Sequence, residues 1–267
     1  MLTAVHVPTS VSEAVAQLDR GGTVLGGGTV LMPLLTTEAS PPTELVSLRR
    51  AGLAGVSREG DEIVIGAATT LGALARDEQV AFLRDAVRTI ASPPVRNLAT
   101  VGGNLFAKAP YGDLATCLLA LDARVEIAGS DGQRVAPVAE VIADGVDAGE
   151  LVTAVRFTAP DPSTWRYRKA MRRRYNSAAI VTVAAVVETD GDTVTAARIA
   201  LGGVAPRPVR ATSAEAALVG RRFVREEVEA AAAAAVDDAD PFDDPYASAW
   251  YRARVLPVHL RRALLGE

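Results

Sequence analysis

The chain has 267 residues, of which 49% are hydrophobic and 22% charged, a composition typical of a folded protein with a sizeable core. Its formal net charge is -4, so no overall positive field draws it to nucleic acid or to anionic lipid. The single cysteine, Cys117, excludes an internal disulfide, a thiolate zinc centre and an iron–sulfur cluster held by this chain. The sequence has no signal-peptide pattern and no apolar run of membrane-spanning length, so we expect a cytoplasmic location.

Helix and strand signals alternate along the first 160 residues. Ser10 is a hydroxyl cap and predicts a helix that starts after it. Residues 71–95 carry apolar side chains at roughly helical spacing and predict a long helix, which we expect Pro93 and Pro94 to stop. Residues 113–121 predict a helix that is apolar on nearly all sides and therefore buried. Strands are predicted at residues 23–25, 44–48, 62–66, 124–127 and 150–157.

The pattern changes after a linker candidate at residues 161–163. Residues 178–187 and 193–201 predict a hairpin whose turn is Asp190-Gly191-Asp192. The tail from residue 212 is predicted to be helical. We therefore expect an α/β region up to about residue 160 and an α+β region beyond it.

Two glycine-rich segments, residues 26–29 and 100–104, each contain a threonine. A glycine turn lets backbone N–H groups point into one space without obstruction from Cβ, which is how proteins grip phosphate oxygens. Counted from Gly22, residues 22–29 have P-loop spacing, but Gly28 stands where the lysine is needed. Neither segment fits the G-x-G-x-x-G dinucleotide pattern. A single glycine turn is more often a plain bend, whereas the two together favour a diphosphate site.

Residues 24–34 and 96–105 resemble the two flavin-binding loops of the medium, FAD-carrying subunits of the xanthine dehydrogenase and carbon monoxide dehydrogenase family of molybdenum hydroxylases. The resemblance continues through residues 109–114, 167–169 and 199–210, in the same order and spacing. It implies an α+β protein. A p-cresol methylhydroxylase-type FAD-binding fold would occupy residues 1–160, in two α/β subdomains at about 1–52 and 53–160. A C-terminal domain with a small antiparallel sheet and helices would follow at residues 165–267.

The resemblance also implies which residues hold FAD, and it implies no catalytic residue and no metal ligand. One loop facing the pyrophosphate would be Gly26, Gly27, Gly28, Thr29 and Val30, and the other Thr100, Val101, Gly102, Gly103 and Asn104. Asp113 would hydrogen-bond a hydroxyl of the cofactor, Leu151 would pack near the isoalloxazine, and Lys169 would approach the flavin or its phosphates.

Three positions depart from the family pattern. The family usually has a small polar residue where Val30 stands, usually serine where Ala109 stands, and often aspartate where Asn176 stands. The first change removes a hydrogen bond at a phosphate loop, so we expect FAD to bind more weakly than is typical.

The implied function is an FAD-dependent electron-transfer subunit that takes electrons from [2Fe-2S] clusters and passes them to an external acceptor. Substrate oxidation would take place on partners, a large molybdopterin-containing subunit and a small [2Fe-2S] subunit in a heterotrimer. Neither nucleic acid nor membrane insertion is expected. Two alternatives stay open: a stand-alone binding or assembly module of the same fold with weak or lost FAD binding, and an independent flavin oxidase, for which no convincing general base is found.

Six basic residues fall within nine positions around Trp165, Tyr167 and Tyr175. A solvated strand edge or helix face would explain them, and so would a docking surface for an acidic partner subunit or for cofactor phosphates. Nucleic acid is disfavoured because only 4% of the chain is aromatic. The six are Arg166, Arg168, Lys169, Arg172, Arg173 and Arg174.

Overall fold

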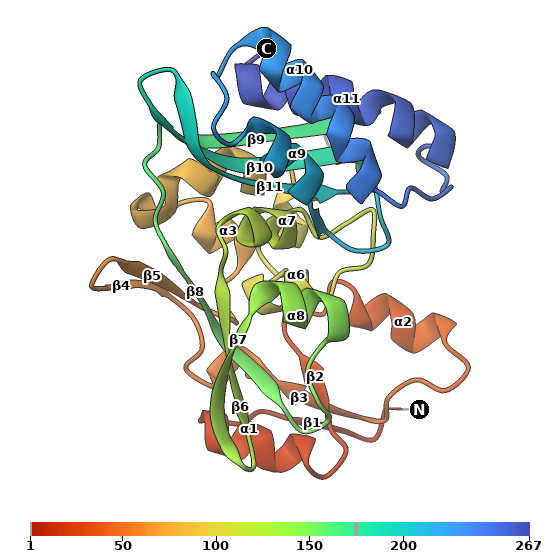
Figure 1. Cartoon of the computed structure of the whole chain (residues 1–267). Coiled ribbons are helices and arrows are strands. Elements are labelled where there is room, and N and C mark those ends of the chain that lie inside the picture. Colours follow the sequence, from red (N-terminus) through yellow and green to blue (C-terminus); the bar gives the residue numbers. More distant parts are fainter. Residues whose placement is uncertain (1, 174–175) are drawn as a thin grey trace. The chain divides into compact units, whose positions relative to one another are not determined.

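The structure is a computed structural model that describes residues 2–173 and 176–267. The chain forms two compact units that do not follow chain order (Figure 1). The first unit comprises Met1–Ala81, Ser92–Ala107 and Arg124–Phe157, and the second comprises Phe82–Ala91, Lys108–Ala123 and Thr158–Glu267. The division of the sequence near residue 160 stays a prediction.

A small parallel sheet of order β1-β3-β2 opens the first unit. Helix α1 (Val11–Leu18) begins where the Ser10 hydroxyl accepts a hydrogen bond from the N–H of Glu13 at 3.2 Å, as its sequence predicts. The helix buries Ala14, Val15 and Leu18 in a core cluster that includes Val46 of β3. The strands are β1 (Ala4–His6), β2 (Thr23–Leu25) and β3 (Glu44–Ser47), and α2 (Leu31–Thr37) follows β2.

The second sheet of this unit has five strands in the order β4-β5-β8-β6-β7. Arg156 on β8 ties the sheet together, because its guanidinium meets Glu59 at 3.1 Å, Glu62 at 2.9 Å and Glu126 at 2.7 Å. Arg124 pairs with the other oxygen of Glu62. The strands are β4 (Val56–Glu59), β5 (Glu62–Gly66), β6 (Arg124–Gly129), β7 (Gly132–Pro137) and β8 (Leu151–Thr158), and the accompanying helices are α3 (Leu71–Leu74), α5 (Pro93–Arg96), α6 (Val101–Leu105) and α8 (Val138–Asp144).

This charge network predicts a dependence of stability on pH. Hydrogen bonding to Arg124, and then to Arg156, lowers the pKa of Glu62 below its usual value. A carboxylate whose pKa is lower in the folded chain than in the unfolded chain stabilises the fold above its unfolded pKa, and this stabilisation is lost as pH falls through the folded pKa. We expect the urea midpoint to drop between about pH 5 and pH 3, and Glu62→Gln to flatten that part of the profile. Glu226→Gln, at an exposed position, is the control, and a profile for Glu62→Gln as steep as the control's would contradict the assignment.

The second unit is built on a four-stranded antiparallel sheet of order β12-β11-β10-β9. The predicted hairpin is β10 with β11, and the turn contains Gly191 at φ +55°. The strands are β9 (Trp165–Met171), β10 (Ala179–Asp190), β11 (Thr193–Gly202) and β12 (Val209–Arg210), and the helices are α4 (Arg84–Arg88), α7 (Asp113–Ala120), α9 (Thr212–Leu218), α10 (Arg225–Ala234) and α11 (Ala249–Leu265).

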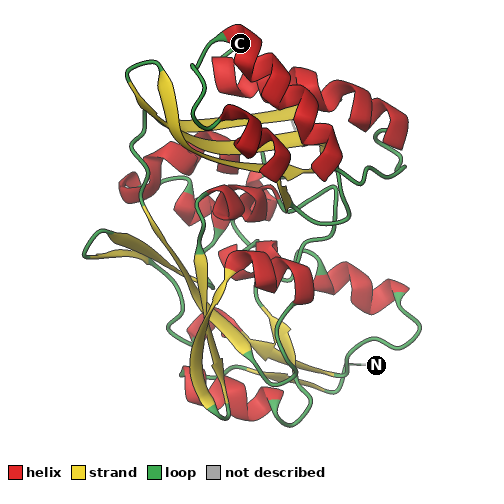
Figure 2. Ribbon diagram, in the orientation of Figure 1, coloured by secondary structure: helices red, strands yellow, loops and turns green. Residues whose placement is uncertain are grey.

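Strand β10 is apolar on both faces because helices cover both (Figure 2). Val181, Val183 and Ala185 share a core cluster with residues of α9, α10 and α11. The alternate positions, beginning with Thr182, face α7, since the Thr182 hydroxyl donates to Asp113 at the start of that helix. None of the helices in the described ranges combines the length and hydrophobicity that a membrane crossing needs.

Arg252 on α11 fastens this helix to the sheet although its side chain is completely buried. Its Nη1 donates to the carbonyls of Ile180 at 2.7 Å and Gly203 at 2.6 Å, and its Nη2 donates to Asp244 at 2.6 Å. The guanidinium thus satisfies carbonyls where β10 carries a bulge, between Ala179 and Val181.

The long helix predicted over residues 71–95 is wrong. The structure has α3, a 3-10 stretch at Glu78–Leu83, α4 and α5 in its place. The backbone leaves helical geometry at Val80 (φ -122°, ψ 30°) and turns left-handed at Ala91 (φ 49°). Pro93 opens α5 instead of ending a helix, because proline fits the first helical position, where its missing N–H is not needed. The predicted apolar positions are buried nonetheless, which is why their spacing imitated a continuous helix.

Candidate functional site

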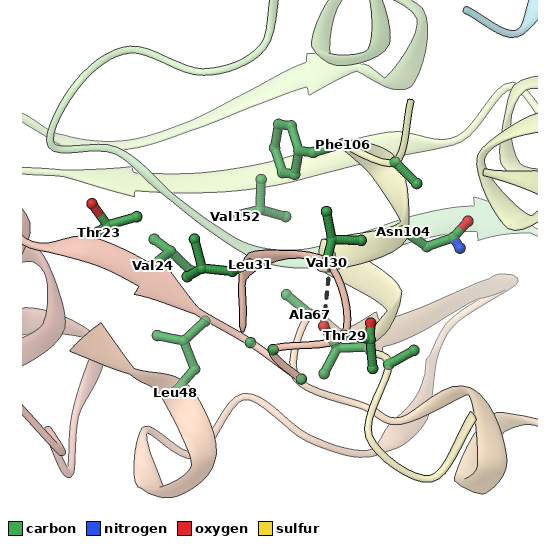
Figure 3. A pocket seen from close by; sticks show the side chains of 18 of the residues that line it. Thr23, Val24, Thr29, Val30, Leu31, Leu48, Ala67, Asn104, Phe106 and Val152 are labelled. Carbon is green, nitrogen blue, oxygen red and sulfur yellow. Dashed lines mark hydrogen bonds between the residues drawn. The ribbon is translucent and has the colours of Figure 1, made fainter. Parts of the chain in front are cut away.

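A cavity of about 360 Å³ lies in the first unit, and every residue that lines it belongs to that unit (Figure 3). This volume is within the usual range for small-molecule sites. Both glycine-rich segments line it, so two stretches of chain about seventy residues apart meet at one space. The walls are Thr23, Val24, residues 26–31, Leu34, Leu48, Ala67, Ala99, Thr100, residues 102–104, Phe106, Ala107, Val146 and residues 150–152.

Glycine is required in the first segment because the two segments touch. A Cβ on Gly27 would stand 1.8 Å from the carbonyl oxygen of Leu98, which is a backbone atom that no side-chain movement can remove. Gly28 has φ +69°, a conformation that residues with a side chain rarely adopt. The sequence Gly26-Gly27-Gly28 therefore fixes both the turn after β2 and its close approach to residues 98–100.

The amide groups of the first segment point to an anionic ligand. Among the residues that the structure describes, none accepts a hydrogen bond from the N–H groups of Gly27, Gly28 or Thr29. These residues line the cavity, and backbone N–H groups without a protein partner need another acceptor. A cluster of such groups in a turn suits phosphate oxygens.

The second segment contributes differently from the expectation. Its N–H groups are engaged within the chain: Val101 donates to Thr69 at 2.9 Å, Gly102 to Ala67 at 2.8 Å and Gly103 to the Thr100 hydroxyl at 3.2 Å. The cause is the short helix α6, for which Thr100 is the N-cap. Thr100, Gly102, Gly103 and Asn104 still form part of the cavity wall, whereas Val101 is buried and does not.

The rest of the cavity is mostly apolar. Figure 3 shows side chains of this wall, with Val30, Phe106 and Val152 labelled. Val30 is 54% exposed and Phe106 46% exposed, although both are large apolar side chains. Leu151 is only 2% exposed, because it also joins the core cluster around α1. An amide-lined edge beside an apolar wall fits a ligand that has both a diphosphate and flat rings, which is the chemistry of FAD.

One charged residue at the wall was not predicted from the sequence. Glu150 receives two hydrogen bonds from Arg134, at 2.6 and 2.7 Å, and one from the N–H of Asp147 at 2.9 Å. The Arg134 contacts lower the pKa of Glu150 below its usual value. These three hydrogen bonds hold Glu150, and with it the turn before β8, in place beside Leu151. Sequence reasoning had no signal for it, because Arg134 lies on another strand.

Asp113 and Lys169 lie in the second unit. They form an ion pair with 2.8 Å between Oδ2 and Nζ, and their side chains are 4% and 2% exposed. Asp113 is the first residue of α7, and Lys169 is on the edge strand β9. The pairing of these two candidates with each other was not predicted.

The basic cluster on and after β9 is largely used inside this chain. Arg166 donates to the carbonyl of Leu264 at 3.4 Å, and Arg168 donates to that of Glu267. Leu264 is in the last turn of α11 and Glu267 lies just beyond it, so both guanidinium groups are near the helix end that attracts cations. Arg172 donates to the carbonyl of Pro245 at 3.1 Å. Arg166 and Arg168 are half-buried, whereas Arg172 and Arg173 are exposed, so a docking surface at the exposed pair stays a prediction. Arg174 and Tyr175 lie outside the described residues.

The remaining reactive side chains are not arranged for chemistry of their own. Burial raises the pKa of the Cys117 thiol well above its usual value, so the thiol packs as an inert apolar group. Burial, and then the charge of Arg168, lowers the pKa of His259. No cluster of three or more potential metal ligands occurs in the described part of the chain.

Comparison with known proteins agrees with this geometry. Residues 2–160 match the FAD binding domain in molybdopterin dehydrogenase, and residues 165–266 match the CO dehydrogenase flavoprotein C-terminal domain. The carbon monoxide dehydrogenase medium chain of Hydrogenophaga pseudoflava is 32% identical over 277 residues, which cover 97% of this chain and 94% of that protein. The medium chain from Afipia carboxidovorans is also 32% identical, over 271 residues with the same coverage of both chains.

A solved structure gives the same result for the fold. The carbon monoxide dehydrogenase from Hydrogenophaga pseudoflava that lacks the Mo-pyranopterin moiety of the molybdenum cofactor contains a chain that superposes with a TM-score of 0.93. The two chains are 32% identical, and the match covers 99% of this chain and 96% of that one. The predicted FAD-binding α+β fold is confirmed.

Proposed function

This chain belongs to the FAD-binding medium subunits of the molybdenum hydroxylase family, and from that premise we propose that it carries electrons from [2Fe-2S] clusters of a partner subunit to an external acceptor. The chain is an FAD-dependent oxidoreductase subunit. A bound flavin accepts electrons one at a time and can pass on two, so the redox chemistry belongs to the cofactor. The protein binds the cofactor and orients it.

The observation that carries this proposal is a mostly apolar cavity lined by Gly27, Gly28 and Thr29, whose N–H groups have no acceptor among the described residues. In the proposal, these N–H groups bind the diphosphate of FAD, and Gly26 and Val30 complete that loop. Thr100, Gly102, Gly103 and Asn104 form the adjoining part of the wall, and Val101 is buried and does not line the cavity. Leu151 offers an apolar surface to the ring. Asp113 and Lys169 remain proposed cofactor contacts on the strength of the family resemblance.

The side chains around the cavity favour electron transfer over an independent oxidase. Among the described residues that line the cavity, Glu150 alone has a titratable side chain. Both of its carboxylate oxygens accept hydrogen bonds from Arg134, which also lower its pKa. A carboxylate that is held in this way is a poor general base. Proton abstraction from a substrate has no candidate group at this wall.

We also propose the partners. The donor would be a small subunit with [2Fe-2S] clusters, and the substrate would be oxidised on a large molybdopterin-containing subunit, in a heterotrimer in the cytoplasm. The support is that several relatives are medium chains of dehydrogenases and that the one cysteine of this chain is buried. Co-purification from the native host should then bring molybdenum, iron and flavin through the column together with this chain.

Reconstitution tests the proposal directly. The purified chain is mixed with FAD, passed through a desalting column and scanned for flavin absorption. We expect a yellow complex with one FAD per chain. A colourless eluate at saturating FAD would mean that cofactor binding has been lost, and it would favour the alternative of a binding or assembly module.

The departure at Val30 yields a prediction about affinity. Val30→Ser restores a hydroxyl beside the amide loop, so FAD should bind about two- to tenfold more tightly, the value of one net hydrogen bond. Val30 lines the cavity and is 54% exposed, so the fold tolerates the change. Flavin fluorescence quenching measures the dissociation constant. Val30→Ala, which removes the same bulk without adding a donor, is the control, and equal affinities for the two variants would rule out the hydrogen bond.

A further inference from the structure

A chain of buried and half-buried polar groups runs through the second unit and ends in the Asp113–Lys169 pair. The Thr182 hydroxyl donates to Asp113 Oδ1 at 2.6 Å, and Lys169 Nζ donates to Asp113 Oδ2 at 2.8 Å. The same Nζ donates to the carbonyl of Thr89 at 3.1 Å. The Thr89 hydroxyl in turn shares a hydrogen bond with the Tyr167 hydroxyl at 2.8 Å.

These groups come from four elements of the unit. Asp113 begins α7, Lys169 and Tyr167 lie on β9, Thr182 lies on β10, and Thr89 follows α4. Thr182 stands directly opposite Lys169 in the β9–β10 register, so the two strands present both partners of Asp113 side by side. Orientation of the carboxylate therefore depends on the sheet and not on α7 alone.

Thr182 is a polar exception on its strand. It is completely buried, and the next positions on its face of β10, Ala184 and Val186, are apolar. Valine would fill the same volume without a hydroxyl that needs a partner. A buried hydroxyl is costly unless it is hydrogen-bonded, and the Thr182 hydroxyl meets this requirement by donating to Asp113.

The hydrogen bonds of this network hold the Asp113 carboxylate in one orientation. Each oxygen of the Asp113 carboxylate has its own donor, so rotation of the carboxylate would break a hydrogen bond in a dry environment. Burial, and then the charge of Asp113, raises the pKa of Tyr167 well above its usual value, so its hydroxyl keeps its proton. The ammonium of Lys169 is held at both the carboxylate and the Thr89 carbonyl.

We propose that Thr182 is a positioning residue for flavin binding, which holds the Asp113 carboxylate in the orientation that the cofactor needs. Tyr167 acts at the far end of the network by holding Thr89, and through it Lys169. This inference rests on the proposed function, which assigns Asp113 and Lys169 to FAD. An acceptor that is already oriented costs less entropy to engage, so losing Thr182 weakens binding even though Thr182 itself does not touch the cofactor.

The test uses the full chain and measures the FAD dissociation constant, the midpoint potential of the bound flavin and the thermal midpoint of the chain without FAD. Thr182→Val keeps the volume and removes the donor, and it should raise the dissociation constant about tenfold. Thr182→Ser keeps the donor and should stay within about twofold of the wild type. Thr164→Val is the matched control, since Thr164 also gives a hydrogen bond, to the carbonyl of Asp161, but lies outside the network.

Four results decide the matter. If the wild type does not bind FAD, the proposed function and this inference fall together. If the wild type binds and Thr182→Val binds equally well with an unchanged potential, only the inference is overturned, even when the thermal midpoint has dropped. If Thr182→Val is weaker while Thr182→Ser and Thr164→Val are not, the positioning role is supported. Should Thr182→Val fail to fold, Tyr167→Phe decides, because a Kd more than about threefold weaker supports the proposal and an unchanged Kd overturns it.

Discussion

Replacing Gly27 by alanine is expected to abolish measurable FAD binding and to destabilise the first unit. The added Cβ would lie 1.8 Å from the Leu98 carbonyl oxygen and 2.4 Å from its carbon. Both atoms belong to the backbone, so the loop after β2 has to move away from residues 98–100. We expect a cost of about 3 kcal/mol in unfolding free energy, at the upper end for overpacking. FAD affinity should fall at least about a hundredfold, because the amide cluster moves with the loop.

Gly52→Ala is the matched control for this effect. Gly52 is in the same unit and has φ +74°, but an added Cβ there meets nothing within 4 Å. It should cost only the left-handed backbone penalty of about 1–2 kcal/mol and leave FAD affinity unchanged. Urea unfolding and flavin titration measure both quantities. If Gly27→Ala bound FAD as tightly as Gly52→Ala, the close contact of the two segments would not be what shapes the site.

Removing the charge of Lys169 should strongly destabilise the second unit. Lys169→Met leaves the Asp113 carboxylate in place, 4% exposed, without its cation. Breaking one side of a buried pair costs about 3–5 kcal/mol, because the remaining charge stays buried and uncompensated. Adding Asp113→Asn to Lys169→Met should recover part of this loss, and a double-mutant cycle measures the coupling by chemical unfolding.

The ion pair between Arg222 and Asp192 is the comparison for that experiment. It has 3.1 Å between its atoms, but the side chains are 68% and 75% exposed. Arg222→Met should therefore cost less than about 1 kcal/mol. A loss for Lys169→Met no greater than for Arg222→Met would show that water reaches the Asp113–Lys169 pair, and the network around Thr182 would lose its basis.

The sequence predicts an element correctly where a few neighbouring residues decide its structure. The cap at Ser10 and the hairpin turn at residues 190–192 each depend on a few adjacent residues. Residues 113–121 were predicted to form a buried helix that is apolar on nearly all sides, and every residue of α7 is buried. The break between α3 and α5 was missed because buried apolar residues repeat in similar ways in a long helix and in short ones.

The sequence by itself determined the family, the α+β fold and the two glycine segments, since these depend on the order and spacing of residue types along the chain. Only the tertiary structure decided how each group is used. In it, the amides of the second segment donate to Ala67, Thr69 and Thr100. Arg166 and Arg168 bind carbonyls near the end of α11. Asp113 forms hydrogen bonds with both Lys169 and Thr182. The reason is that a hydrogen bond or an ion pair depends on which distant elements pack together, and spacing along one segment carries no information about its partner.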